Sequence, residues 1–448
     1  MRQSVLALAL CGGLALGAVV PDASEQQPLN HDESLDENIV FDAQQISAWW
    51  DQFVPMDTIK SAFADAAEAA ESMVDTTVSA MKEVQDKAAM ELNKLHHAQD
   101  GHKNKRTKTV YQLISALPHT RRFAKLVGEF PDLVNILNST DADGEYTIFV
   151  PHDDAFKDIP DDHEKPDKQL IEKVLQYHIG NGKFKAEKLV ASYTLPTILD
   201  EKWLGNEKQR LRTSWDLWGV KINFYSKVIA ADIEGTNGVV HVVNHFLVPP
   251  PVVGIIISLF PAEFSTLLLA YEKADFVKFV HGQKMAGSTV FAPSNKAFEA
   301  LGPRANAFLF NTESGKKYLS AILKYGIVPN VTIYSDTVYD KSSSQEGVGN
   351  TLPQKHYDLT TLLPKAHLGV DIGHFLGFNF IKINGFTDVS IHDAIARNGV
   401  IHVVNQVVLP PHKGHNGKAA KTADITVEEL KERLSDYVDE DEFYWSEL

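Results

Sequence analysis

The hydrophobic pattern of residues 109–250 recurs, in the same order, in residues 254–411. Three landmarks carry the repeat: "YTIFVPHDDAF" matches "STVFAPSNKAF", "VLQYHIGNGKF" matches "ILKYGIVPNVT", and "NGVVHVVNHFLVPP" matches "NGVIHVVNQVVLPP". The distance between matching landmarks grows along the chain, so the second copy carries insertions, which we place at Ser342–Asn350 and around "GHFLGFNF". A duplicated unit of this length predicts two tandem domains.

Each copy opens with a short β-branched and aromatic run, Thr147–Val150 and Thr289–Ala292, that ends at a proline. Proline lacks the N–H that a sheet needs, so both runs are predicted strands that stop there. Polar residues follow, and we expect Asp153 and Asn295 to cap the helical turn that comes next.

Apolar residues at steps of three and four predict one amphipathic helix in each copy. "DKQLIEKVLQYHI" places Leu170, Val174, Leu175 and His178 on one face, and "GKKYLSAILKYGI" repeats the pattern.

The third landmark predicts a β-hairpin in each copy. The pairs Asn237-Gly238 and Asn398-Gly399 stand where two apolar runs meet, and Asn-Gly is the preferred pair for a turn in which both residues have positive φ. The run after each pair is continuously apolar, which predicts a strand buried on both faces.

His241 and His402 sit at matching places among the valines of these strands. We expect neutral core histidines, bonded to a main-chain carbonyl or to Asn244 or Asn405. Catalysis or metal binding would need a nucleophile, a carboxylate or further ligands at a recognisable spacing. None stands at such a spacing in either copy, so we expect no catalytic residue, no metal and no cofactor.

The ordered motifs "T-x-F-x-P-x-[DN]-x-A-F", "YH" and "D-I-x-x-x-N-G-V-[VI]-H-V-V-N" resemble the fasciclin domain, present twice. The resemblance implies an α+β protein with two tandem, wedge-shaped β-sandwich domains, each with a small helical layer. It also implies a secreted or surface-tethered adhesion protein without enzyme activity.

Some fasciclin proteins bind integrins through an Asp-Ile pair and a Tyr-His motif. The matching residues in the first copy are Asp232, Ile233, Tyr177 and His178. The second copy departs from both motifs, so adhesion of this kind would depend on the first copy. The competing interpretation is that Asp232 and His178 are structural.

Residues 1–18 resemble a secretory signal peptide, with a positive start, an apolar core and small residues before the cleavage site. Cys11 is the only cysteine and lies within this segment, so no disulfide is expected. Asn138 and Asn330 begin sequons, and the polar, turn-like surroundings favour Asn138 as the glycan acceptor.

Residues 19–108 contain an acidic stretch, a long amphipathic pattern over 59–95 and a basic linker. The pattern predicts one long helix capped by Asp57, which docks on the repeats or self-associates. The pair Lys105-Arg106 is a candidate processing site, although an uncut linker is the simpler interpretation.

Residues 412–448 form an acidic tail in which Thr426 and Glu429 predict a capping box for a short helix. Leu430, Leu434 and Val438 lie on its apolar face.

The net charge of −16 argues against nucleic-acid binding, which depends on a basic surface. No stretch has the length and apolarity of a transmembrane anchor. The sequence has no GxSxG or HExxH motif. The second copy has Ser294, Asn295 and Lys296 where the first has His152, Asp153 and Asp154, which suits capping better than acid chemistry.

The leading hypothesis is therefore a secreted, glycosylated, non-enzymatic protein that binds a protein or glycan of a cell surface, wall or matrix. The alternative is a factor of the vacuole or the secretory-pathway lumen that engages a protein partner through its N-terminal helix.

Overall fold

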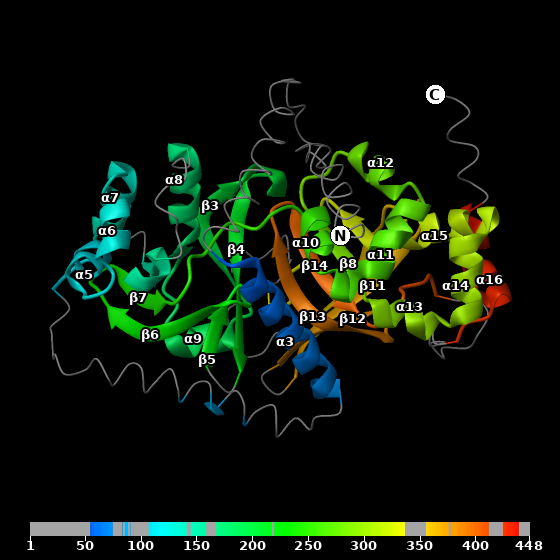
Figure 1. Cartoon of the computed structure of the whole chain (residues 1–448), viewed down its shortest axis with the longest axis horizontal. Helices are drawn as coiled ribbons and strands as arrows, with labels where there is room; N and C mark the ends of the chain where they lie inside the picture. The colour runs from blue at the N-terminus through cyan, green and yellow to red at the C-terminus, as the bar shows by residue number, and fades with distance from the viewer. Residues whose placement is uncertain are drawn as a thin grey trace. The chain divides into compact units, whose positions relative to one another are not determined.

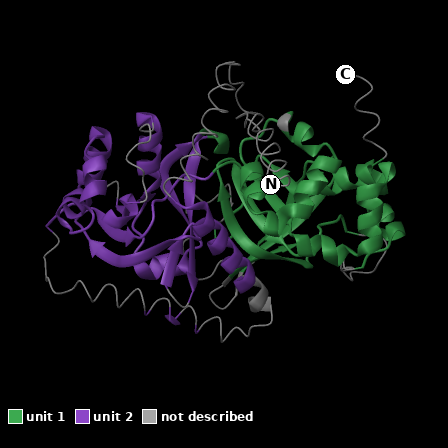
Figure 2. Cartoon of the chain, viewed as in Figure 1, with its two compact units in different colours: residues 1–43, 202–205, 251–448 green, residues 44–201, 206–250 purple. Residues whose placement is uncertain are grey.

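The computed structural model of the 448-residue chain describes residues 54–74, 83, 86–87, 90, 107–140, 145–157, 167–216, 219–336, 355–375, 378–411 and 424–438. The chain divides into two compact units, which Figure 2 shows in two colours. Unit 2 comprises residues 44–201 and 206–250, and unit 1 comprises residues 1–43, 202–205 and 251–448.

Unit 2 contains one seven-stranded sheet, in which each strand is hydrogen-bonded to the strand that follows it along the chain. The sheet closes on itself because the last strand pairs in parallel with the first, from Tyr146 against Gly238 to Pro151 against Val243. The strands are β1 (Tyr146–Pro151), β2 (Ile179–Asn181), β3 (Thr194–Glu201), β4 (Glu207–Asp216), β5 (Gly219–Ile222), β6 (Ser226–Glu234) and β7 (Gly238–Val243).

The described helices of unit 2 are short, apart from α3 (Met56–Val74). Three of them, α5, α6 and α7, lie together (cyan in Figure 1), and α5 contacts β7. The helical elements are α3 (Met56–Val74), α5 (Val110–Ala116), α6 (Arg121–Val127), α7 (Pro131–Asn138), the 3-10 turn η1 (Asp153–Phe156), α8 (Lys168–Tyr177) and α9 (Ala186–Ala191). A further turn, η2 (Lys202–Leu204), belongs to unit 1.

Unit 1 repeats the same sheet in an open form. Its order is β10-β11-β12-β13-β14-β8-β9, with β14 parallel to β8. This is the strand order of the closed sheet of unit 2, interrupted between the strands that correspond to β2 and β3. The strands are β8 (Ser288–Pro293), β9 (Ile327–Pro329), β10 (Lys355–Thr360), β11 (His367–Phe375), β12 (Phe378–Ile383), β13 (Thr387–Ala396) and β14 (Gly399–Val404).

The helices of unit 1 include three, α14, α15 and α16, that contact one another beside the sheet (Figure 1). The helices described in this unit are α10 (Val253–Leu259), α11 (Pro261–Lys273), α12 (Phe276–His281), α13 (Asn295–Leu301), α14 (Pro303–Asn311), α15 (Glu313–Tyr325) and α16 (Val427–Val438). The sequence therefore predicted correctly two tandem, sheet-rich domains with helices.

The core of each unit is built around the strand that follows the Asn-Gly pair. Every residue of β7 and of β14 is buried, as their continuous apolar runs predict. In unit 2 the side chains of Phe149, Tyr177, Leu211, Val228 and Val243 belong to one buried apolar cluster. Burial of so much apolar surface is the main source of stability for a chain whose only cysteine is Cys11.

The prediction that Asp153 caps the following helical turn was wrong. The η1 turn is capped by His152, whose Nδ1 accepts the Asp154 N–H at 3.2 Å. Asp153 instead accepts the Arg122 N–H at 3.0 Å and so binds the first turn of α6, 31 residues earlier. The N-cap residue of α6, Thr120, makes no side-chain cap bond, so Asp153 supplies the acceptor that this helix start lacks.

Asn295 departs from the prediction in the same way. Ser294 caps α13 by accepting the Ala297 N–H at 3.2 Å. The Asn295 Oδ1 accepts the Thr266 N–H of α11 at 2.8 Å. The two copies therefore share a contact between distant elements that local spacing did not reveal.

The N-terminal amphipathic pattern forms helix α3, which begins at Met56, so that Asp57 lies within its first turn and does not cap it. Ile59 and Phe63 are buried, and the Phe63 ring lies 5.5 Å from that of Phe224 within unit 2. The apolar stripe of α3 therefore packs on its own protein. Most of the predicted helix beyond Val74 lies outside the described residues.

The tail helix α16 begins after Thr426, whose hydroxyl accepts the Glu429 N–H at 3.1 Å. Leu430, Leu434 and Val438 are buried. Within the described part of the chain, no helix is long and apolar enough to span a membrane.

Candidate functional site

His241 is a fully buried residue in the middle of β7. Its Nε2 lies 2.8 Å from the carbonyl oxygen of Phe184, and its Nδ1 accepts the Asp232 N–H at 3.4 Å. The ring stacks on Phe149 of the neighbouring strand, with centroids 5.5 Å apart. Both nitrogen atoms therefore have main-chain partners, and the imidazole is the neutral tautomer with its proton on Nε2.

His402 repeats this arrangement in β14. Its Nε2 lies 2.8 Å from the carbonyl oxygen of Ile333, its Nδ1 accepts the Asp393 N–H at 3.3 Å, and its ring stacks on Phe291 at 5.5 Å. The prediction of core histidines bonded to a main-chain carbonyl is confirmed. Asn405 has other partners, the hydroxyls of Ser294 and Ser390.

Burial keeps both imidazoles neutral. Desolvation lowers the pKa of His402 to about 4, against the opposing effect of its bond to the Ile333 carbonyl. Desolvation also lowers the pKa of His241, although the Phe184 carbonyl and the charge of Asp232 favour the protonated form. A neutral, fully bonded ring without access to solvent has no free atom for proton transfer to a substrate.

Asp232, the first candidate adhesion residue, is half-buried at a β-bulge of β6 with a φ of 58°. Its Oδ1 accepts the Ala186 N–H at 2.8 Å, a bond that fixes the start of α9. Asp393 has the same φ of 58° in β13 and accepts both the N–H and the hydroxyl of Ser335. The same structural use in both copies favours the structural interpretation of Asp232. Ile233 is half-buried beside it and pairs with Val240.

Tyr177 and His178, the other two candidate adhesion residues, are completely buried. The Tyr177 hydroxyl donates to the Arg210 carbonyl at 3.0 Å and accepts from Asn223 Nδ2 at 2.9 Å. Tyr325 has the same two bonds in unit 1, to the His367 carbonyl and from Asn384. Neither Tyr177 nor His178 can touch a ligand in this conformation.

His178 has no histidine counterpart in unit 1, where Gly326 follows the tyrosine. Its Nδ1 lies 2.8 Å from the Val174 carbonyl, and its Nε2 accepts the Leu247 N–H at 2.9 Å. Burial lowers the pKa of His178 to about 4, against the effect of the Val174 carbonyl.

The Asn-Gly pairs do not form the turn that we predicted. Gly238 and Gly399 have φ of 159° and 153°, but Asn237 and Asn398 do not have positive φ. Asn237 is instead buried and uses its side chain: it accepts the Val110 N–H at 2.9 Å and donates to the carbonyls of Leu137 and Ser139.

Glycine follows each asparagine because the parallel strand passes very close. A Cβ on Gly238 would lie 2.1 Å from the Tyr146 carbonyl oxygen, and one on Gly399 would lie 2.1 Å from that of Ser288. Asn398 holds the start of α10 by accepting the Val253 N–H at 2.9 Å, as Asn237 holds that of α5. The pair thus fixes a helix to the sheet at matching places in both copies.

The two sequons differ in accessibility. Asn138 is the last residue of α7, and its Oδ1 accepts the Thr109 hydroxyl at 2.6 Å. Asn330 is exposed after β9, with a φ of 58°, and its Oδ1 accepts the Ala286 N–H at 2.8 Å. Asn138 therefore does not lie in the turn that the sequence predicted, and Asn330 is the more accessible of the two.

Other predicted site residues either have local partners or lie outside the described residues. Asp154 forms an ion pair with Lys157, and this bond is the main cause of the lowered pKa of Asp154. Lys105 and Arg106 lie outside the described residues. Among the residues that the structure describes, no three His, Cys, Asp or Glu side chains gather as a metal site would require.

Sequence reasoning missed a threonine that ties each sheet to the chain after its second strand. The Thr147 hydroxyl donates to the Gly182 carbonyl at 2.8 Å and accepts the Phe184 N–H at 2.7 Å. Thr289 makes the matching bonds to Val331 and Ile333. The sequence did contain a signal for this contact, because a threonine stands at the same place in both apolar runs.

Comparison with known proteins matches the fasciclin domain model to residues 118–249 and 262–410. The aurofusarin biosynthesis cluster protein S of Gibberella zeae is 27% identical over 360 residues, which cover 74% of this chain and 87% of that protein. Periostin of Homo sapiens is 28% identical over 63% of this chain and 30% of its own length.

Stabilin-1 of Mus musculus is 24% identical over 47% of this chain and 8% of its own length. The chain therefore spans less than a third of periostin and stabilin-1. A solved fasciclin domain pair from the insect cell adhesion molecule fasciclin I is 19% identical, with a TM-score of 0.32, and the match covers 65% of this chain and 97% of that one. The family assignment rests on the two domain matches, which together cover more than half of the chain.

Proposed function

The chain belongs to the fasciclin family, and from that membership we propose that it is a secreted, glycosylated, non-enzymatic protein that binds a protein or glycan of a cell surface, wall or matrix. Fasciclin domains occur in adhesion and matrix proteins. The observation that carries the proposal is that the polar groups repeated in both domains bond to the main chain of their own domain. Because these groups are already bonded, we expect a partner to contact other, exposed side chains.

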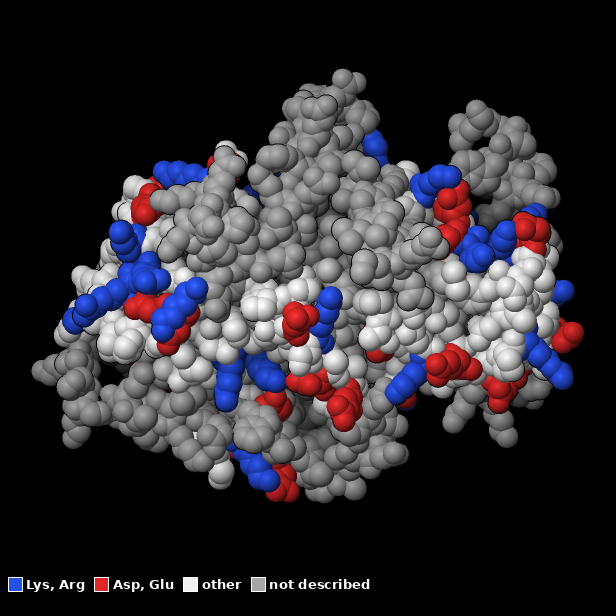
Figure 3. Space-filling model, viewed as in Figure 1, with Lys and Arg blue, Asp and Glu red and all other residues white. Residues whose placement is uncertain are grey.

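The charge distribution supports a protein or glycan partner over a nucleic acid. Lys and Arg are interspersed with Asp and Glu on the face shown in Figure 3, and the chain has a net charge of −16. Mixed charge of both signs suits protein recognition, whereas phosphate recognition needs a continuous basic surface.

Asp232 and Ile233 are the two candidate adhesion residues that retain some exposure, so the binding surface on unit 2 would include the bulge of β6. The matching place in unit 1 has Asp393 followed by Ala394. Ile233→Ala is therefore a substitution that the same fold already accommodates in the other copy, and Asp232→Asn keeps the acceptor for the Ala186 N–H.

The test is retention of the purified, glycosylated full chain on wall or matrix preparations and on cells. We expect saturable retention that falls at least about fivefold in Ile233→Ala, with an unchanged melting temperature. Asp388→Ala changes an exposed residue of β13 outside this surface and serves as the control. Absence of saturable retention on all surfaces would refute the proposal, and equal loss in the control would refute the assignment of the surface.

Glycosylation and secretion are tested on the same material. We propose that Asn330 carries a glycan, because it is exposed, and that the half-buried Asn138 is modified to a smaller extent. Peptide mass spectrometry before and after glycosidase treatment should show the mass change at Asn330. The same peptides show whether the chain is cut after Lys105-Arg106 and where its mature N-terminus lies.

A second candidate function follows from the relative named for a biosynthesis cluster, which this chain matches over 87% of that protein's length. In this case the protein would be a non-catalytic factor of the secretory-pathway lumen or vacuole that holds a partner enzyme through its N-terminal segment. Fractionation separates the two candidates. Recovery in vacuolar or microsomal fractions, with co-purification of an enzyme that requires residues 19–106, would favour the second.

A further inference from the structure

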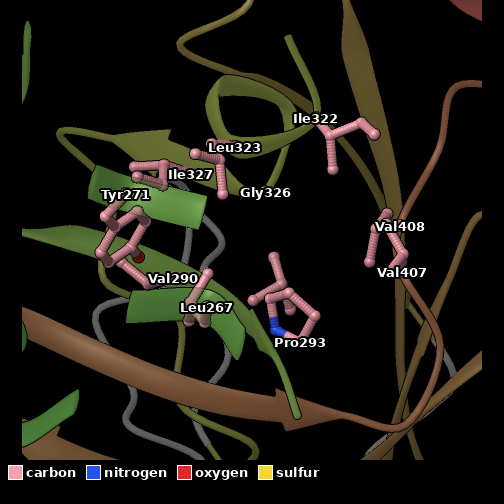
Figure 4. A pocket seen from close by; sticks show the side chains of 11 residues that line it. Leu267, Tyr271, Val290, Pro293, Ile322, Leu323, Gly326, Ile327, Val407 and Val408 are labelled. Carbon is pink, nitrogen blue, oxygen red and sulfur yellow. The ribbon is translucent and has the colours of Figure 1, made fainter. Parts of the chain in front are cut away.

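Unit 1 contains an apolar pocket between its helices and its sheet, which Figure 4 shows from close by. Its walls come from α11, β8, α15, β9 and the segment after β14. Tyr271 supplies the only polar side chain of the lining. The pocket has an empty volume of about 310 Å³, which includes space open to solvent.

In the matching region of unit 2, three aromatic rings pack against one another. His178 lies 5.2 Å from the Phe123 ring and 5.7 Å from the Phe246 ring, measured between centroids. All three side chains are buried. The imidazole sits between the two phenyl rings and fills the space behind the strand that ends at Pro151.

The residues at the three matching places of unit 1 are all smaller, and all three line the pocket: Leu267, Gly326 and Val407. Shared contacts and sequence landmarks pair each of these residues with Phe123, His178 or Phe246 of unit 2. Leu267 follows the residue whose N–H binds Asn295, as Phe123 follows the residue whose N–H binds Asp153. Gly326 follows the buried tyrosine, and Val407 stands two residues after the asparagine that ends the landmark strand.

Loss of the imidazole also removes a hydrogen-bond acceptor. In unit 2 the Leu247 N–H donates to His178 Nε2 at 2.9 Å. Val408 takes the place of Leu247 and lines the pocket. Among the residues that the structure describes, no acceptor is found for the N–H of Val408. A main-chain N–H in an apolar wall is costly to leave without a partner.

We propose that this pocket of unit 1 binds a small, planar heteroaromatic ring with one acceptor atom. The ring occupies the place that the His178 imidazole fills in unit 2, between Leu267 and Val407, and its acceptor atom takes the Val408 N–H. Part of the ring lies in the space that is open to solvent. The Tyr271 hydroxyl is the second polar group available to such a ligand.

The lining of the pocket supports a neutral ligand. Burial raises the pKa of the Tyr271 phenol, so that hydroxyl stays protonated and can donate. No charged side chain is among the lining residues. A cation or a carboxylate would lose its hydration without compensation, whereas a neutral ring loses little. This binding site is independent of the adhesion surface proposed above, which lies on unit 2.

The experiment uses imidazole as the probe, titrated into the isotopically labelled full chain and followed by amide NMR signals. At pH 8 the neutral ring has an acceptor nitrogen, and we expect saturable shifts at Val408 and Leu267 with millimolar affinity. At pH 5 imidazole is protonated, both nitrogens are donors, and the shifts should disappear. Benzene is a planar aromatic ring without an acceptor atom and should shift Leu267 much less at equal concentration.

Two variants make the test decisive. Gly326→His restores the residue of unit 2, at a backbone φ outside the left-handed region, and should weaken imidazole binding at least about tenfold. Its new Cβ would lie 3.1 Å from the Phe291 carbonyl oxygen, a tight contact. Val407→Phe fills the pocket from the other side and replaces Gly326→His in the binding test if that variant does not fold.

The outcomes separate clearly. Saturable shifts at Val408 that are lost in either filled variant support the proposal. No saturable shift in the unmodified protein at pH 8, or shifts that persist in a folded, filled variant, would overturn it. Equal response to benzene and imidazole would also contradict the role of the Val408 N–H.

Discussion

Replacement of Asn237 by alanine is the most informative perturbation of the sheet-to-helix junction. The side chain is 3% exposed and makes three hydrogen bonds, with Val110 at 2.9 Å, Leu137 at 2.9 Å and Ser139 at 2.7 Å. A hydrogen bond contributes about 1 kcal/mol net, and a buried group left without its partner costs about 1–3 kcal/mol. Water can reach part of the vacated space, so we expect Asn237→Ala to lower the free energy of unfolding by about 3 kcal/mol.

The matched control is Asn398→Ala in unit 1. Within the part of the chain that the structure describes, the Asn398 side chain makes one such bond, accepting the Val253 N–H at 2.9 Å, so its loss should cost about 1–2 kcal/mol. Asn237→Asp keeps the acceptor for the Val110 N–H but places a carboxylate oxygen against the carbonyl oxygens of Leu137 and Ser139, so it should cost at least as much as Asn237→Ala at neutral pH.

The assay is equilibrium unfolding in guanidinium chloride, followed by tryptophan fluorescence and by far-ultraviolet circular dichroism. Because the chain has two units, the curves are fitted with one transition for each. A loss of less than about 1 kcal/mol for Asn237→Ala, or an equal loss for Asn398→Ala, would refute the reasoning. Either result would mean that the asparagine serves mainly the turn, as the sequence alone suggests.

Three other positions give predictions that can be tested by the same kind of measurement. Gly399→Ala should cost at least about 3 kcal/mol, because its Cβ would meet the Ser288 carbonyl oxygen at 2.1 Å, whereas Gly385→Ala, at φ 77° with nothing within 4 Å, should cost only about 1 kcal/mol in the same unfolding assay. Thr426→Ala should cost about 1 kcal/mol, because α16 loses its cap, and an unchanged unfolding midpoint would contradict this. His402 has a folded pKa of about 4 against 6.5 when unfolded, so its contribution is fully present above pH 6.5 and is lost as the pH falls; about 2 kcal/mol should be lost by pH 5. In His402→Gln that part of the pH dependence should vanish, and an unaltered slope between pH 5 and 7 would show that His402 does not cause it.

The sequence predicted those features that depend on local periodicity. The continuous apolar run of β7 and the helical spacing of α8 each require only neighbouring residues to be read, and both elements form as predicted. The buried state of His241 followed from its valine neighbours for the same reason.

The errors occurred where a side chain bonds to a distant element. Asp153 binds Arg122, 31 residues earlier, and Asn237 binds Val110, 127 residues earlier. No spacing rule relates such positions, so each residue was assigned to the turn in which it stands. The repeat itself held the missing information, because both copies keep an acceptor at these two places.

The candidate adhesion motif shows the same limit. Resemblance to a family identifies matching residues but not their exposure, and the structure buries Tyr177 and His178 completely. The contrast between His178 and Gly326 was visible in the sequence. Its consequence for the pocket was not, because the ring partners Phe123 and Phe246 come from segments on either side that only the fold brings together.

The central claim is that the repeated histidines serve a duplicated scaffold and perform no chemistry. Long-range ¹H–¹⁵N NMR spectra of the imidazole nitrogens, recorded from pH 8 to pH 5.5 on the full chain, test it most directly. We predict that His241 and His402 both carry their proton on Nε2 and stay neutral throughout. A titration midpoint near 6.5 for either ring, or a proton on Nδ1, would contradict the account.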